Sequence, residues 1–200
     1  MLATHVSLIR SLLLPANQWS PGRLSHNTAA TDPHDRRARL LHARLLRPLS
    51  PPTTSSQTAC WSWVTGPRDA LDIGLLHAGV VLHGARLRRR LVAGPLKDQL
   101  TAHIGTKRLA QALRYEGEVA DLAMDKPDHD VLLVSGLAVM YRYARMASVD
   151  AGRRLLLRHA PDDPSLRASV AWMRRLPAKA CVPIGEMVLE SFDVIKEETT

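Results

Sequence analysis

The chain has few aromatic side chains. Its 200 residues include one Phe, three Tyr and four Trp, although 46% of all residues are hydrophobic. The hydrophobic residues are mostly Leu, Ala and Val, and Leu and Ala lose little conformational freedom in a helix. The composition therefore favours an all-α fold over a β-sandwich, and the length suits one domain, alone or with a loosely attached segment.

Cysteine is also scarce, and long apolar runs are lacking. Cys60 and Cys181 are far apart in the sequence, so we expect two free thiols and a reducing compartment. A membrane span needs roughly 20 consecutive apolar residues, whereas His77 and His83 interrupt the first candidate run. Arg10 lies inside the apolar start of the chain, which argues against a secretory signal. We therefore expect a cytoplasmic protein.

The motifs of common enzyme classes are lacking as well. The chain has no Gly-x-Ser-x-Gly elbow, no phosphate-binding loop and no dinucleotide fingerprint. Among nine histidines, His77 and His83 are six residues apart and point to different sides of a helix. The run 128–130, Asp-His-Asp, is better explained by helix capping. We predict a protein without catalytic activity, cofactor or metal.

The formal net charge of the whole chain is +8, and the excess of basic residues lies in its first half. Residues 1–100 contain 13 Lys and Arg against 5 Asp and Glu, whereas residues 101–200 contain 14 of each. The densest basic cluster, predicted here to bind a partner, consists of Arg86, Arg88, Arg89 and Arg90, with Lys97 close behind. Arginine clusters bind acidic protein surfaces or nucleic-acid phosphates. No nucleic-acid-binding motif accompanies the cluster, so a protein partner is favoured; a basic nucleic-acid-binding or regulatory protein is the alternative.

Proline and glycine divide the chain into two unequal parts. Residues 1–67 are predicted to be loosely ordered, with one short helix over 33–47 and a Pro/Ser/Thr-rich linker over 48–58. A short strand pairing at residues 61–64 is an alternative to a loop there. Residues 68–195 are predicted to form an irregular multi-helix domain, followed by an acidic tail at 196–200.

Hydrophobic periodicity places the helices of this domain. A core helix is expected from residue 69 to 92, ended by Gly94-Pro95, and a shorter helix from Pro95 through Ile104. The pair Gly105-Thr106 separates it from a third helix that contains Leu109, Leu113 and Tyr115. After an acidic loop, a second core helix follows residue 131, with Asp128 or Asp130 as its N-cap. Three further amphipathic segments are expected at 149–159, 164–176 and 183–195.

One stretch resembles a known family. Residues 75–89, LLHAGVVLHGARLRR, and residues 91–96, LVAGPL, are similar to the central segment of the K component of bacterial type III secretion systems, the SctK or YscK family, called NolU in rhizobia. A second similarity is the small-residue patch at 135–138, Ser-Gly-Leu-Ala. The family begins with an aromatic and Pro-containing segment, whereas residues 15–67 are poor in aromatics and rich in Pro, Arg and Ser.

The resemblance implies a specific function. A K component would be a cytosolic adaptor of the sorting platform, linking the platform's Q component to the cytoplasmic domain of the inner-membrane ring protein. It would be peripheral to the inner membrane through these partners, and it would need no cofactor. The rhizobial branch would further imply a role in nodulation and host specificity.

Overall fold

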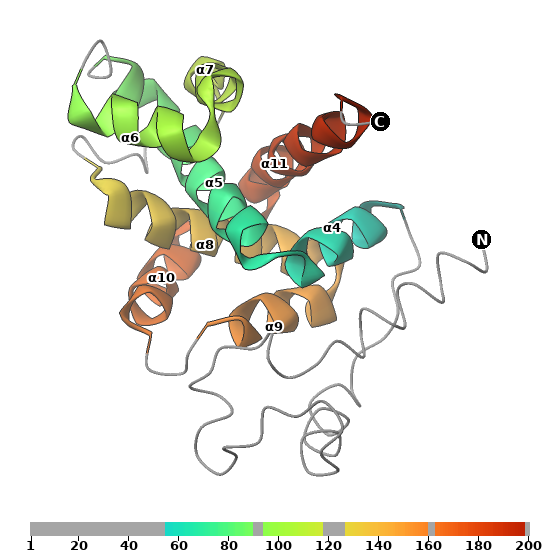
Figure 1. The fold of residues 1–200 in the computed structure, drawn as a ribbon. Coiled ribbons are helices and arrows are strands. Elements are labelled where there is room, and N and C mark those ends of the chain that lie inside the picture. Colours follow the sequence, from blue (N-terminus) through green and yellow to red (C-terminus); the bar gives the residue numbers. More distant parts are fainter. Residues whose placement is uncertain (1–54, 90–93, 118–126, 160–162, 199–200) are drawn as a thin grey trace, which may run out of the picture.

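The predicted all-α class is confirmed. The computed structural model describes residues 55–89, 94–117, 127–159 and 163–198, and within these ranges all regular secondary structure is helical (Figure 1). The eight helices of the described ranges are α4 (Ser55–Thr65), α5 (Arg68–Arg88), α6 (Pro95–Ile104), α7 (Thr106–Arg114), α8 (His129–Ala147), α9 (Val149–Leu157), α10 (Pro164–Arg175) and α11 (Ala178–Glu198). The helix predicted at 33–47 lies outside the described residues.

Helices α5 and α8 form the centre of the fold and cross at two glycines. A Cβ atom added to Gly136 of α8 would lie 1.8 Å from the carbonyl oxygen of Leu75 on α5. A Cβ atom added to Gly79 of α5 would lie 1.9 Å from the carbonyl oxygen of Leu132 on α8. The two backbones are therefore in direct contact, which only glycine permits at these positions.

The remaining helices surround this crossing. Figure 1 shows α6 and α7 together near one end of α5, α4 near its other end, and α9, α10 and α11 around α8. Most of α5 is buried, including both of its histidines, because neighbours cover it on several sides. Long helices that are apolar all round are expected to be buried in this way.

Helix α5 also meets the length and hydropathy criteria for a membrane span. It is the one such helix among the described residues, and 72% of its most apolar window is buried inside the protein. A buried core helix passes the same criteria, so this finding is weak grounds for a span.

Helix α4 corrects two predictions about residues 1–67. Residues 61–64 form part of a helix and not a strand, and residues 55–58 of the predicted linker belong to the same helix. The side chains of Cys60, Trp61 and Val64 are at most 1% exposed and join the common core. The folded core therefore begins before residue 68, because burial of this apolar face stabilises a helix that its Ser- and Thr-rich start does not predict.

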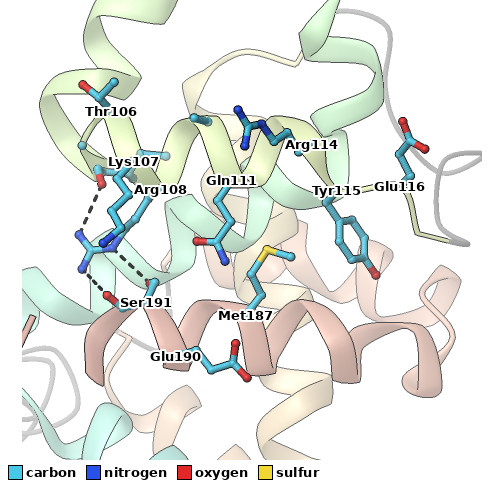
Figure 2. Close-up of a pocket in the computed structure, with 13 residues that line it drawn as sticks. Thr106, Lys107, Arg108, Gln111, Arg114, Tyr115, Glu116, Met187, Glu190 and Ser191 are labelled. Atoms are coloured by element: carbon cyan, nitrogen blue, oxygen red, sulfur yellow. Dashed lines mark hydrogen bonds between the residues drawn. The ribbon is translucent and has the colours of Figure 1, made fainter. Parts of the chain in front are cut away.

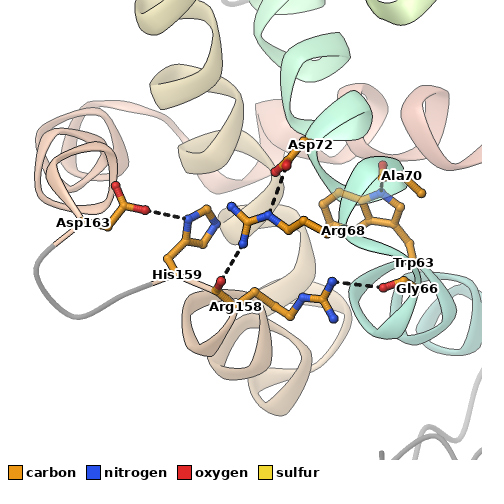
Figure 3. Close-up of polar contacts among 8 residues, drawn as sticks. All are labelled: Trp63, Gly66, Arg68, Ala70, Asp72, Arg158, His159 and Asp163. Atoms are coloured by element: carbon orange, nitrogen blue, oxygen red, sulfur yellow. Dashed lines mark hydrogen bonds and ion pairs between the residues drawn. The ribbon is translucent and has the colours of Figure 1, made fainter. Parts of the chain in front are cut away.

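Polar contacts fasten the α4–α5 corner to the end of α9 (Figure 3). Arg68 donates from Nη1 to the carbonyl oxygen of Arg158 at 2.6 Å and from Nε to Asp72 at 3.0 Å. Arg158 in turn donates from Nη2 to the carbonyl oxygen of Gly66 at 3.1 Å. Two arginines thus satisfy backbone carbonyls that the helix ends leave unpaired.

The predicted ends of the other helices are correct in part. Asp128 caps α8, accepting a 2.8 Å hydrogen bond from the amide of Val131, as one of the two predicted caps. Pro95 opens α6 as predicted. The last helix, however, begins at Ala178, so that Pro183 lies inside α11 and does not open it, and the helix continues through Glu198 into the predicted acidic tail.

Both thiols are predicted to be inert in the folded protein. Cys60 and Cys181 are free and fully buried, and burial raises the pKa of Cys60 to about 12 and that of Cys181 to about 11. Since the thiolate is the reactive form, a thiol reagent at pH 8 should label neither residue until the protein is unfolded. Labelling followed by mass spectrometry checks this expectation. Rapid native labelling of Cys60 would mean that α4 is not packed as described.

Candidate partner-binding surface

The predicted basic cluster lies at the end of α5, and its members differ in environment. Arg88 and Arg89 are exposed, Arg86 is half-buried, and Lys97 is half-buried on α6. Arg90 lies outside the described residues. Of the described members, the structure therefore exposes Arg88 and Arg89 and partly covers Arg86 and Lys97.

Arg88 holds the end of α5 to the end of α7. Its Nε donates to the carbonyl oxygen of Leu113 at 2.7 Å, and its Nη1 pairs with Glu116 at 3.0 Å. Arg88 and Arg89 line a hollow of about 360 Å³, here called the Arg88 hollow, together with Tyr115 and Glu116. Neither Arg86 nor Lys97 lines it. Arg88 thus has a structural contact, whereas the side chain of Arg89 borders an open hollow.

A larger depression lies between α7 and α11 and is called the α7 groove (Figure 2). Its volume is about 940 Å³ and its surface is mostly apolar. Figure 2 shows Gln111 pointing from α7 toward Met187 on α11, and Tyr115 extending toward α11 beside Met187. The groove and the Arg88 hollow are both lined by Tyr115 and Glu116, so the two adjoin.

Arg108 connects the two walls at one end of the groove. It donates from Nε to Ser191 Oγ at 3.2 Å and from Nη2 to the Ser191 carbonyl oxygen at 3.1 Å, and its guanidinium lies over the Phe192 ring at 4.6 Å. Partial burial lowers the pKa of Arg108. Ser191 Oγ also lies 3.4 Å from Nδ1 of the buried His77. These contacts fix the spacing of α7 and α11 and hence the width of the groove at this end.

The walls of the groove and the hollow are predominantly basic. Five cationic residues line them against two carboxylates: Arg88, Arg89, Lys107, Arg108 and Arg114 against Glu116 and Glu190. The difference, five minus two, is a charge of +3 over the two adjoining depressions. Together the α7 groove and the Arg88 hollow can therefore accept an apolar ligand with acidic groups.

The two histidines considered as metal ligands face different helices. His83 Nε2 lies 3.1 Å from Ser135 Oγ on α8, and its ring contacts Trp172 of α10 edge-on. His77 faces Ser191 on α11. Within the described ranges, His, Cys, Asp and Glu form no group of three that could hold a metal ion.

The α7 groove was not predicted, although one signal for it is present in the sequence. Residues 106–114, TKRLAQALR, contain three basic and no acidic residues. Leu109 and Ala112 are buried, while Lys107, Gln111 and Arg114 are exposed. A basic amphipathic helix of this kind is a signature of a binding surface.

Three comparisons with known proteins were made, and no family model, curated protein or solved structure matches this chain.

Proposed function

We propose that this protein is a cytosolic, non-enzymatic adaptor of a bacterial type III secretion system, binding the platform's Q component and the cytoplasmic domain of the inner-membrane ring protein. The observation that carries the binding role is the apolar, basic-walled α7 groove and its continuation at Arg89. Such a surface is suited to a protein segment of opposite charge. A nodulation and host-specificity role would follow for a rhizobial member.

The residues behind the family resemblance support a shared fold more directly than shared contacts. The stretch 75–89 occupies most of α5, and the patch 135–138 lies on α8. Gly79 and Gly136, one from each stretch, are the residues at which the two helices cross. A chain that retains this spacing can retain the same helix pair, while its surface residues determine its partners.

Pull-down experiments with purified components test the proposal. The full-length chain should retain both the Q component and the ring protein's cytoplasmic domain from the same genome. Arg89→Glu should weaken one of these interactions about tenfold, because it places a like charge against an acidic partner. Arg167→Glu on α10 is the matched control: Arg167 is also exposed but lines neither depression.

Binding of neither component by the unaltered chain would contradict the proposal, whereas unchanged binding of both by Arg89→Glu would exclude the surface at Arg89. A gel shift then tests the alternative, nucleic-acid binding, for which the basic walls are also suited. Affinity for DNA or RNA that falls steeply with salt concentration would favour that alternative, because phosphate contacts release counterions.

A further inference from the structure

We propose that the α7 groove binds an acidic amphipathic helix of a partner protein, with the carboxylates of that helix directed toward α7. This inference rests on the proposed adaptor function and names the chemistry of one of its partners. Three observations carry it: the shape of the groove, the placement of its charges and the charge of residues 1–54.

The shape suits a helix. The α7 groove runs between two helices, is open along one side and has a volume of about 940 Å³. Its surface is mostly apolar, with Met187 and Tyr115 half-buried between the walls. An amphipathic helix is about 10 Å across and buries one apolar stripe. Apolar side chains at positions i, i+3/i+4 and i+7 of a partner helix would occupy such a groove.

The charges favour one orientation of the bound helix. Lys107 and Arg114 are exposed and seven residues apart on α7, so they lie on one face about two turns apart. Carboxylates spaced by seven residues on the bound helix could pair with both. On the opposite wall, Glu190 of α11 is exposed and would repel a carboxylate. The acidic edge of the partner is therefore expected to face α7, and its neutral or basic edge α11.

The N-terminal part of the same chain is poorly suited as the occupant. Residues 1–54 contain two acidic residues, Asp32 and Asp35, against seven arginines: Arg10, Arg23, Arg36, Arg37, Arg39, Arg44 and Arg47. A segment with this charge would meet a like charge at the basic wall. Charge complementarity thus favours an acidic helix of another protein over this basic N-terminal segment.

A titration with a designed peptide tests the inference. The probe is a fluorescent synthetic peptide of about 15 residues, long enough to form a helix, with Leu on one face and Glu on the other. Its affinity for the full-length chain is measured by anisotropy at physiological ionic strength. Lys107→Glu combined with Arg114→Glu should weaken binding about tenfold or more, and Glu190→Lys should strengthen it.

A matched pair of substitutions controls for net charge. Arg167→Glu combined with Arg174→Glu changes the net charge equally, at exposed positions of α10 outside the groove. This double variant should bind the peptide within about twofold of the unaltered chain. A second peptide with Lys in place of every Glu should bind at least tenfold more weakly than the first.

An independent readout does not depend on charge reversal. Gln111→Cys places a thiol in the groove, and an environment-sensitive fluorophore should attach there selectively because Cys60 and Cys181 are buried. Addition of the acidic peptide should shift the emission of this label. The same label at Arg167→Cys should not respond.

Several outcomes would overturn the inference. The first is that the two double variants weaken peptide binding equally, and the second is that the Lys peptide binds as tightly as the Glu peptide. The third is that the label at position 111 does not respond to the peptide. The fourth is that the chain forms a concentration-dependent dimer that covers the label. If the peptide experiments fail but the pull-down retains the platform partners, the adaptor function is supported and only the proposed role of the α7 groove is excluded. If the chain binds the peptide but retains no platform partner, the role of the groove is supported and the assignment to a secretion system is excluded.

Discussion

Replacing Gly136 by alanine should lower the free energy of unfolding by about 3 kcal/mol or more, and Gly79→Ala should have a similar effect. In a helix that does not touch its neighbours, the same change would stabilise by up to about 1 kcal/mol, because alanine is the better helix former. Here the new methyl groups would lie 1.8 and 1.9 Å from carbonyl oxygens of the opposite helix. Those oxygens belong to the backbone and cannot rotate away, so α5 and α8 must separate and expose part of the core.

Urea denaturation of the two variants measures the effect. Gly152→Ala on α9 is the control, since its methyl group would meet atoms of Arg145 at 3.1 to 3.3 Å, a distance that a small shift can relieve. Its free energy of unfolding should change by less than about 1 kcal/mol. Unchanged stability of Gly136→Ala would mean that the two helices do not cross in backbone contact.

The helical class and the identity of the two core helices could be predicted because they depend on local information. The apolar positions of α5 and α8, the capping carboxylate of Asp128 and the start at Pro95 act within a few residues along the chain. Gly136 belongs to the small-residue patch at 135–138, and Gly79 lies within the stretch 75–89. Their partners could not be identified, because the contact joins residues that are far apart in the chain.

Helix α4 and the ends of α11 show where local reasoning fails. Residues 55–65 begin with two serines, and their helix is stabilised by burial of Trp61 and Cys60 against the rest of the protein. Pro183 ordinarily disfavours a helix around it. The burial of Cys181, Ile184 and Val188 on either side compensates within α11.

The α7 groove depends entirely on tertiary contacts. Arg108 and Ser191 are 83 residues apart, yet their hydrogen bonds fix one end of the groove. Adjacent charges are easy to recognise in a sequence, so the run of arginines at the end of α5 was predicted to bind a partner. The charged residues of α7 are separated by helical spacing. They line a groove only because α11 forms its opposite wall.

The protein should lose stability as the pH falls from about 6.5 to 4, because two histidines are buried in the neutral form. Burial, with a smaller contribution from the charge of Arg108, lowers the pKa of His77 from 6.5 to about 4, and burial lowers that of His83 to about 4. Above pH 6.5 these groups are neutral in the folded and unfolded states alike. Below it the unfolded state takes up protons that the folded state excludes, so unfolding becomes more favourable down to about pH 4.

The expected size of this loss is on the order of 3 kcal/mol for each histidine, since one pKa unit corresponds to about 1.4 kcal/mol. The two contributions together approach the total stability of an ordinary domain. Urea denaturation at several pH values should therefore give a steep decline over this range. Arg108 faces His77 through Ser191 and adds a positive charge, so protonation of His77 within the fold is opposed by more than burial alone.

A single substitution should separate the contribution of one buried histidine from the rest of the pH dependence. His83→Gln removes one titrating group and should reduce the slope of unfolding free energy against pH without abolishing it, because burial also lowers the pKa of His77 and of His159. His103→Gln is the control, because His103 is exposed on α6. NMR titration of the unaltered protein provides a measurement that does not depend on any variant: the ring protons of His77 and His83 should not titrate between pH 7 and 5. A midpoint near 6.5 for either ring would contradict its burial as a neutral group and, for His77, the packing of α11 that forms one wall of the groove.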